Sequence, residues 1–236
     1  MNPKFILFDI DGTLVGIDGA GSRSLNRALL ELTGIPDGFR GINFAGKTDL
    51  QIMREGLGKL GLVDEKGLLQ ALMDSYLLHL REELPKGKPH MKVGVKGVLN
   101  ALRGLEDIYL GVLTGNVETG ARLKLQPFGL GQYFQGGAFG SDSEDRNLLL
   151  PIAVRRLQES ESISVSYERC VVVGDTPRDV ECGLVHGASC IAVATGTYSL
   201  EELENTEADL VVPDLSNTEV IVNWIRNSPK TSPNLQ

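Results

Sequence analysis

The sequence is poor in the residues that build disulfide frameworks and zinc sites. Among its 236 residues there are three cysteines and three histidines, without a Cys-x-x-Cys pair and without metal-ligand spacing of the histidines. An odd number of isolated cysteines argues against a disulfide framework and against structural zinc. We therefore expect Cys170, Cys182 and Cys190 to be buried free thiols in a reducing compartment.

Long apolar runs are also missing. No stretch approaches the ~20 apolar residues that cross a bilayer. The first apolar run, Phe5 to Phe8, is interrupted by Asp9 and is too short for a signal peptide. These features predict a cytoplasmic protein with no membrane partner.

Basic residues are in deficit. Lysine and arginine number 23 against 31 aspartates and glutamates, which gives a formal net charge of −8. Nucleic-acid binding requires a basic face, so no nucleic-acid partner is expected. The acidic excess fits a solvated surface, and part of it also fits a carboxylate cluster that binds a cation.

What is present is an ordinary apolar content, 42% of the chain, arranged in short runs with helical patterns between them. Continuous apolar runs bounded by Gly, Asp, Thr or Pro are typical of parallel strands covered on both faces. Helix-start signals follow most of these runs. The alternation predicts a doubly wound α/β fold. The expected strands are Phe5–Phe8, Ile108–Leu113, Cys170–Val173, Cys190–Val193 and Leu210–Val212, and the helix starts are Thr176-Pro177, Ser199/Glu202 and Ser216/Glu219.

One region breaks the alternation. Residues 22–83 carry apolar stripes at helical spacing and no strand pattern, and residues 85–89 read as a Pro/Gly linker. A helical module is therefore expected between the first two strands. The stripes are Leu25/Leu29/Leu32 before Gly34, Ile52/Met53/Leu57/Leu60 before Gly61, and Leu68/Leu69/Leu72/Tyr76/Leu77/Leu80.

Carboxylates follow the first strand. Asp9 and Asp11 lie where an α/β sheet binds ligands, at the carboxyl end of a strand. Two carboxylates this close repel each other unless a proton or cation separates them. Mg²⁺ favours one or two carboxylates together with substrate phosphate and water. A turn in which the aspartates only bond to local backbone would have the same sequence. This motif alone therefore does not distinguish a metal site from such a turn.

Two later strands also end in polar side chains. Thr114, Gly115 and Asn116 offer a hydroxyl, a permissive glycine and an N-cap side chain to a phosphate at a helix N-terminus. Asp175 and Asp179 add two carboxylates one helical turn apart. Together the strand ends favour a phosphate and magnesium site.

In this combination the chain resembles the haloacid dehalogenase superfamily. DIDGTL is similar to its first motif, LTGN to its second, Arg146 in a polar loop stands at its third, and VVVGDTPRD is similar to its fourth. The resemblance covers nearly the whole chain. It implies a Rossmann-like parallel sheet core with an inserted α-helical cap. We expect residues 1–15 and 86–226 to form the core, 16–85 the cap, and 227–236 a disordered tail.

The resemblance also implies roles for individual residues. Asp9 is expected to attack phosphorus and form an aspartyl-phosphate, and Asp11 to protonate the leaving oxygen and then activate water. Mg²⁺ is the implied cofactor, held by Asp9, by the backbone carbonyl of Asp11 and directly by Asp175. Asp179 is expected to position metal-bound water or Arg146.

The phosphoryl oxygens are expected on Thr114 and on backbone amides near Gly115 and Asn116. The balancing cation is usually a lysine in this family, whereas the corresponding segment here offers Arg146. Arginine can bind a carboxylate or phosphate with two hydrogen bonds, so the substitution is chemically reasonable. Arg155 and Arg156 are the other candidates for this cation, but both lie deep in an expected helix and are more typical of a solvated face.

Single residues separate the reactions of the superfamily. Dehalogenases and phosphonate hydrolases lack the second aspartate of the first motif, but Asp11 is present here. β-Phosphoglucomutases place a histidine soon after that motif, whereas the first histidine here is His79. We expect a phosphoglycolate phosphatase-like phosphomonoesterase acting on a small phosphorylated metabolite. A β-phosphoglucomutase-like phosphotransferase and a non-catalytic phosphate-binding module are the alternatives.

Residues 41–48, GINFAGKT, also match the P-loop of nucleoside triphosphatases. That loop requires a strand directly before it, and the preceding residues are turn formers, which argues against a P-loop enzyme. Thr48 and Gln51 instead have the spacing of a capping box that starts a helix. Lys47 lies beside this helix N-terminus. We expect Lys47 to face Asp9 and bind an anionic or polar group of the substrate; the alternative is a solvated surface lysine.

Overall fold

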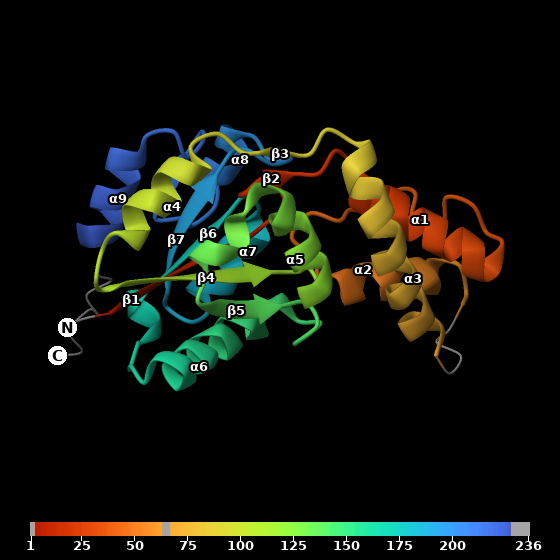
Figure 1. The fold of residues 1–236 in the computed structure, drawn as a ribbon, viewed down its shortest axis with the longest axis horizontal. Helices are drawn as coiled ribbons and strands as arrows, with labels where there is room; N and C mark the ends of the chain where they lie inside the picture. The colour runs from red at the N-terminus through yellow and green to blue at the C-terminus, as the bar shows by residue number, and fades with distance from the viewer. Residues whose placement is uncertain (1–2, 63–66, 228–236) are drawn as a thin grey trace.

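The computed structural model describes residues 3–62 and 67–227. A six-stranded, fully parallel sheet lies at its centre, in the order β5-β4-β1-β6-β7-β8 (Figure 1). The predicted α/β fold with a parallel sheet is confirmed. The strands are β1 Lys4–Phe8, β4 Ile108–Thr114, β5 Gly136–Phe139, β6 Cys170–Gly174, β7 Ser189–Val193 and β8 Leu210–Val212.

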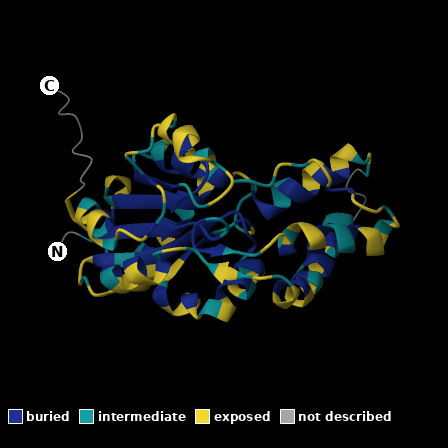
Figure 2. Cartoon of the chain, turned by 90° about the horizontal axis from the view of Figure 1, so that it is seen from above, coloured by how far each residue is buried: buried dark blue, intermediate teal, exposed yellow. Residues whose placement is uncertain are grey.

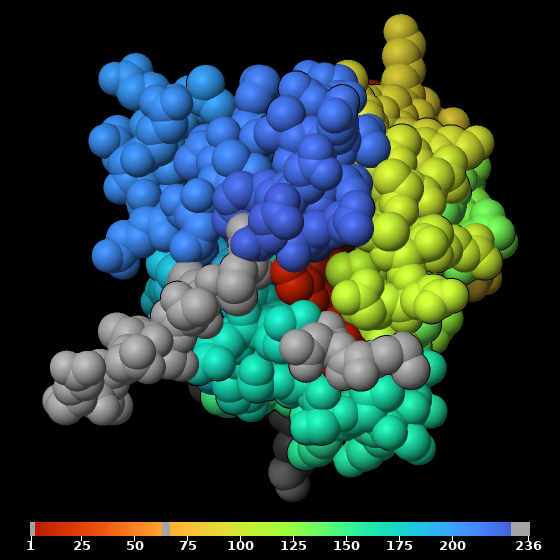
Figure 3. Space-filling model, turned by 90° about the vertical axis from the view of Figure 1, so that its left-hand side faces the viewer, coloured from red at the N-terminus to blue at the C-terminus, as the bar shows by residue number. Residues whose placement is uncertain are grey.

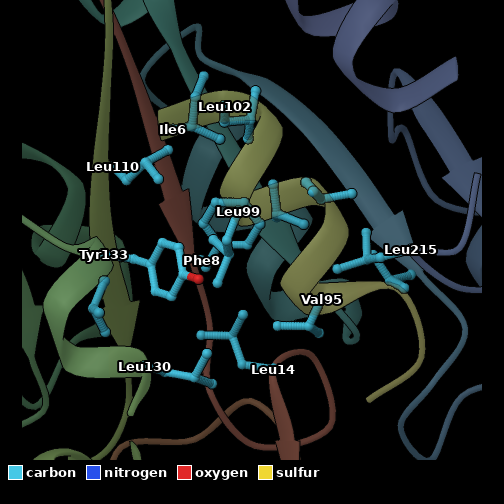
Figure 4. Close-up of a cluster of buried hydrophobic side chains, with 14 of the residues drawn as sticks. Ile6, Phe8, Leu14, Val95, Leu99, Leu102, Leu110, Leu130, Tyr133 and Leu215 are labelled. Atoms are coloured by element: carbon cyan, nitrogen blue, oxygen red, sulfur yellow. The ribbon is translucent and has the colours of Figure 1, made fainter. Parts of the chain in front are cut away.

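The sheet is covered by helices on both faces. Ile6 and Phe8 of β1 pack into one hydrophobic cluster, and Phe5 and Leu7 pack into another on the opposite face. Figure 4 shows the first cluster, and Figure 2 shows buried strands between helices whose outer faces are exposed. The first face carries α4 Val95–Arg103, α5 Glu118–Leu125 and α9 Thr218–Asn227, and the second carries α6 Leu149–Glu161, α7 Pro177–Leu184 and α8 Leu200–Glu204.

Three further helices, α1 Ala20–Thr33, α2 Asp49–Lys59 and α3 Leu68–Glu83, pack on one another in a cluster of their own. They lie beyond the carboxyl ends of the strands (Figure 1). Leu25 and Leu29 are buried as predicted, whereas Leu32 is 39% exposed because the buried face of α1 ends at Leu29.

Two short strands join this helical cluster to the sheet. β2, Val15–Gly16, pairs antiparallel with β3, His90–Met91, so the outgoing and returning chain segments lie side by side. Short 3₁₀ turns complete the described chain. They span Leu84–Lys86, Gln126–Phe128, Leu130–Tyr133, Arg146–Leu148 and Tyr167–Arg169.

The opposite end of the molecule carries the amino ends of the strands. Figure 3 views this end, where the red N-terminal segment is visible between blue C-terminal residues and the yellow-green region of α4. The predicted disordered tail, 227–236, lies outside the described residues apart from Asn227, which ends α9. In the part of the chain that the structure describes, no helix combines the length and apolarity needed to cross a bilayer.

Helix caps decide where several helices begin. The predicted capping box of Ser199 and Glu202 is confirmed. The one predicted at Ser216 is wrong, because α9 begins at Thr218 and the Asn217 side chain accepts the amide of Val220 at 3.3 Å. The amide of Ser216 instead donates to a side-chain oxygen of Asp214, which places Ser216 in the preceding turn.

The three cysteines are buried free thiols, as expected. Burial raises the pKa of Cys170 and of Cys182 to about 12, so both thiols stay protonated near neutral pH.

Candidate active site

The carboxyl ends of β1, β4 and β6 border a pocket of about 810 Å³ that continues between α1, α2 and α3. A position at the carboxyl edge of a parallel sheet is the usual ligand site of an open α/β fold. Of the nine site residues predicted from the sequence, Asp179 does not line this pocket and the other eight do: Asp9, Asp11, Lys47, Thr114, Gly115, Asn116, Arg146 and Asp175.

Three buried carboxylates meet at one side of the pocket. Asp9, Asp175 and Asp179 each place an oxygen within 4.8 Å of the others. Burial, followed by the negative charge of Asp179, raises the pKa of Asp9 to about 7. The same two causes, in the same order, raise the pKa of Asp175 well above its ordinary value. Without a cation the cluster therefore favours bound protons.

Arg146 supplies one positive charge to this cluster. Its side chain is 5% exposed, and its Nη2 donates to Asp9 Oδ1 at 3.1 Å and also to Asp179 Oδ1. Burial lowers its pKa, but the charges of Asp179 and Asp9 outweigh burial and raise it, so the guanidinium stays charged. The rival Arg156 pairs instead with Asp142 at 2.6 Å, away from the pocket residues.

Asp179 is committed to neighbouring donors through both oxygens. Its Oδ2 accepts the amide of Thr176 at 3.0 Å and the Thr176 hydroxyl at 2.6 Å, forming the capping box of α7, while Oδ1 accepts from Arg146. Asp175 is less constrained: its Oδ1 accepts the Thr13 hydroxyl at 3.1 Å. The geometry therefore separates a carboxylate that holds Arg146 from one that is available to a cation.

The donor set fits a magnesium ion. Mg²⁺ prefers carboxylate oxygens, and three buried carboxylates beside one guanidinium leave negative charge uncompensated. The backbone also leaves room for Asp175, because Gly12 has φ of 88° and a Cβ there would lie 2.3 Å from Asp175 Oδ2. Asp9, Asp175 and Asp179 thus form an acidic cluster that can hold a metal ion.

Asp11 belongs to a different cluster of polar side chains. Its Oδ2 accepts from Asn116 Nδ2 at 2.8 Å and from Lys124 Nζ at 2.5 Å. Asn116 Nδ2 also donates to the Thr114 hydroxyl at 2.8 Å. The predicted N-cap role of Asn116 is wrong, because the N-cap position of α5 is Val117 and carries no side-chain cap bond. The sequence analysis missed Lys124. Its signal was a lysine on the buried face of a helix, following Gly120 and Ala121 at helical spacing.

The loop before α2 is docked onto the sheet edge. The amide of Asp49 donates to Gly115 O at 2.7 Å, and the Asp49 side chain accepts the amide of Val117 at 2.9 Å. A Cβ on Gly115 would lie 2.1 Å from Lys47 O, so only glycine permits this backbone approach. Burial is the main cause that raises the pKa of Asp49 to about 6.

Thr48 caps α2, because its hydroxyl accepts the amide of Gln51 at 3.2 Å. The reciprocal half of the predicted capping box is absent, since Gln51 Oε1 is buried without a hydrogen-bond partner among the described residues. The described residues 34–48 contain no strand, so the P-loop pattern lacks its required context. Lys47 lines the pocket, but its ammonium pairs with Glu55 and its side chain is 15% exposed.

Comparisons with known proteins agree with this architecture. A family model described as HAD-hydrolase-like matches residues 147–218. A phosphoglycolate phosphatase from Rhodospirillum rubrum is 28% identical over 221 residues, covering 91% of this chain and 89% of that protein. A 5′-nucleotidase from Pseudomonas aeruginosa is 30% identical over 216 residues, covering 89% and 91%. A solved hydrolase from Pseudomonas syringae has a TM-score of 0.72 at 20% identity, covering 95% of this chain and 99% of that chain.

The chain belongs to the haloacid dehalogenase superfamily of hydrolases. Phosphoglycolate phosphatases and a 5′-nucleotidase match it along most of their length, and the chain is a phosphoglycolate phosphatase-like hydrolase. The predicted family and enzyme class are confirmed.

Proposed function

We propose that the protein is a magnesium-dependent phosphomonoesterase that transfers the phosphoryl group of a small metabolite to Asp9 and then to water. The observation that carries this proposal is the position of Asp9. It lies at the end of β1, in contact with Arg146 and within a carboxylate cluster suited to a cation.

The first step uses Asp9 as nucleophile. One of its carboxylate oxygens forms a bond to phosphorus while the bond between phosphorus and the leaving oxygen breaks. The carboxyl group of Asp11 gives its proton to the leaving oxygen, which departs as an alcohol. Arg146 stabilises the negative charge that gathers between Asp9 and the phosphoryl oxygens.

The second step regenerates the enzyme. Water attacks phosphorus, Asp11 takes its proton, and the bond between phosphorus and the Asp9 oxygen breaks to release inorganic phosphate. Bound Mg²⁺ would supply charge neutralisation to Asp9 and the phosphoryl group, with Asp9, Asp175 and the Asp11 carbonyl as its proposed protein ligands. Asp179 would position Arg146 and would not bind the metal directly, because both of its oxygens already accept hydrogen bonds.

The phosphoryl oxygens are assigned to the second strand end. Thr114, Gly115 and Asn116 line the pocket between β4 and α5, whose first helical residue is Glu118. A helix N-terminus attracts anions through its dipole. The amides of Asn116 and Val117 already donate to Thr114 Oγ1 at 3.3 Å and to Asp49 Oδ2 at 2.9 Å, so a bound phosphate would compete with these bonds. We assign these three residues to phosphate binding.

Helices α1–α3 are proposed to act as a cap, residues 16–85, that selects the leaving group. The segments before α1 and between α1 and α2 contribute apolar side chains to the pocket, including Ile17, Phe39 and Phe44. A pocket of about 810 Å³ also admits substrates much larger than phosphoglycolate, because it is within the size range of sites for drug-sized ligands. Nucleoside monophosphates are therefore a second candidate substrate class, in line with the 5′-nucleotidase relative.

Lys47 is the proposed polar contact from the cap. Its place in the pocket lining supports binding to an anionic or polar group of the substrate. Its pairing with Glu55 means that this contact has to compete with an existing ion pair.

The test is a phosphatase assay with p-nitrophenyl phosphate. Activity is expected with Mg²⁺, and none with EDTA or in the Asp9→Asn variant. A panel containing phosphoglycolate, sugar phosphates and nucleoside 5′-monophosphates would then identify the substrate class. Phosphate binding without turnover under all conditions would favour the non-catalytic module, and phosphorylated product from a sugar phosphate would favour the phosphotransferase.

A further inference from the structure

A buried lysine stands beside the proposed acid–base residue. The side chain of Lys124 is 4% exposed, although it carries an ammonium group on helix α5. Burying an ammonium is costly unless acceptors replace its water. Two such acceptors are Asp11 Oδ2, at 2.5 Å, and Asn116 Oδ1. Lys124 also lines the pocket that contains Asp9.

The two oxygens of Asp11 have different surroundings. Oδ2 accepts from both Lys124 and Asn116, whereas Oδ1 is buried and has no hydrogen-bond partner among the described residues. A carboxyl proton avoids an oxygen that already faces two donors, one of them charged. Oδ1 is therefore the oxygen that is free to carry a proton to the leaving group or to accept one from water.

The arrangement is also rigid on the side of Lys124. Asn116 donates to Asp11 and to the Thr114 hydroxyl through one nitrogen, while its carbonyl oxygen accepts from Lys124. Asp11, Asn116 and Lys124 thus form a closed triangle of hydrogen bonds, in which each side chain is held by the other two. The Asp11 side chain is 37% exposed, so its own burial does not fix its rotamer.

We propose that Lys124 is a positioning residue for catalysis, which together with Asn116 holds Asp11 Oδ2 so that Oδ1 performs the proton transfers. This inference rests on the proposed function and deepens it. Arg146 then holds the nucleophile Asp9, and Lys124 holds the acid–base residue Asp11. Lys124 also acts on Asp49: the ammonium lowers the pKa of Asp49, against the larger effect of burial, which raises it.

The experiment compares two substrates in Lys124→Met, Lys124→Arg and the parent at saturating Mg²⁺. 2-Phenylethyl phosphate has a weakly acidic alcohol as its leaving group and needs a proton to depart, whereas the leaving group of p-nitrophenyl phosphate departs unprotonated as p-nitrophenolate. The value of kcat/KM reports only steps up to departure of the leaving group. Lys124→Met should therefore lose about 10- to 100-fold more kcat/KM on the alkyl ester than on the nitrophenyl ester, which is part of the ~10²–10⁴-fold that general acid catalysis contributes. Lys124→Arg should restore most of this loss.

A double-mutant cycle separates positioning from structure. In an Asp11→Ala background, Lys124→Met should cause no further selective loss on the alkyl ester. Arg122→Met, on the exposed face of the same helix, is the matched control and should behave like the parent. Equal losses on both substrates, or full additivity with Asp11→Ala, would overturn the proposal.

Misfolding of Lys124→Met and inactivity of the parent protein would each have a defined meaning. If Lys124→Met does not fold, as judged by its melting transition, Lys124→Gln and Lys124→Arg carry the comparison, and unselective losses in both count against positioning. A parent protein inactive on both esters would contradict the proposed function itself.

Discussion

Arg146 offers the most informative single perturbation of the site. One guanidinium nitrogen contacts Asp9 and Asp179, and another donates to the carbonyl of Gly46 at 3.3 Å. Lysine carries a charge at a single nitrogen and cannot reproduce this planar fork. Methionine keeps much of the volume and removes the charge. The pair Arg146→Lys and Arg146→Met therefore separates the effect of geometry from that of charge.

The magnitude follows from the contacts that are lost. A hydrogen bond to a charged group is worth about 1.5–3 kcal/mol, or roughly 10- to 100-fold in rate if it acts in the transition state. Arg146→Lys should keep one carboxylate contact and lose about 10- to 100-fold in kcat. Arg146→Met loses both contacts and should fall by roughly 10²–10⁴-fold, because the two contributions of about 10- to 100-fold multiply.

The assay is steady-state turnover of p-nitrophenyl phosphate at saturating Mg²⁺, with a melting curve for each variant. Arg156→Lys is the matched control, because Arg156 forms a half-exposed pair with Asp142 away from the pocket. Folded Arg146→Met that retains kcat within about threefold of the parent would refute the reasoning, because another group would then balance the charge on Asp9.

Three further predictions concern the metal, pH and the substrate. Asp175→Ala should weaken the Mg²⁺ dependence of activity much more than Asp179→Ala, and equal shifts in metal titrations would contradict the division of roles. The pKa of Asp9 in the folded metal-free protein, about 7, exceeds the unfolded value of ~3.9, so the folded state holds the extra proton between these values. The stability contributed by Asp9 is therefore lost as pH rises through this window, and Asp9→Asn should gain melting temperature relative to the parent from about pH 4 to pH 7. An unchanged difference between the two proteins would count against the shift. Lys47→Ala should raise KM for the physiological substrate and spare kcat, with less effect on p-nitrophenyl phosphate; parent kinetics on both would assign Lys47 to the surface.

The sequence predicted the sheet well because most strands are continuous apolar runs. β5 was missed, since Gly136 and Gly137 give it no such run and its position depends on pairing with β4. The cap of α9 was misplaced because Ser216 and Asn217 both suit an N-cap, and the turn at Asp214 takes Ser216. The sequence around a helix start does not show which of two adjacent residues is the N-cap when the hydrogen bonds of the preceding turn determine it.

The candidate site divides in the same way. Asp9, Asp11 and Asp175 could be found from motifs because each follows an apolar strand directly. Lys124 could not be found by that route, because it meets Asp11 across 113 residues of sequence and lies within a helix. Contacts of this kind depend on which face of a helix turns toward the sheet edge, and that is a property of the packed structure.

The central claim is that Asp9 becomes phosphorylated during turnover. A rapid acid quench of the enzyme during steady-state hydrolysis, followed by borohydride reduction and peptide mass spectrometry, tests it directly. Reduction of an acyl phosphate at Asp9 should convert this residue to homoserine in the parent, at a level that depends on substrate and Mg²⁺. A fully active enzyme whose Asp9 peptide stays unmodified, or an Asp9→Asn variant that turns over at the parent rate, would contradict the covalent mechanism.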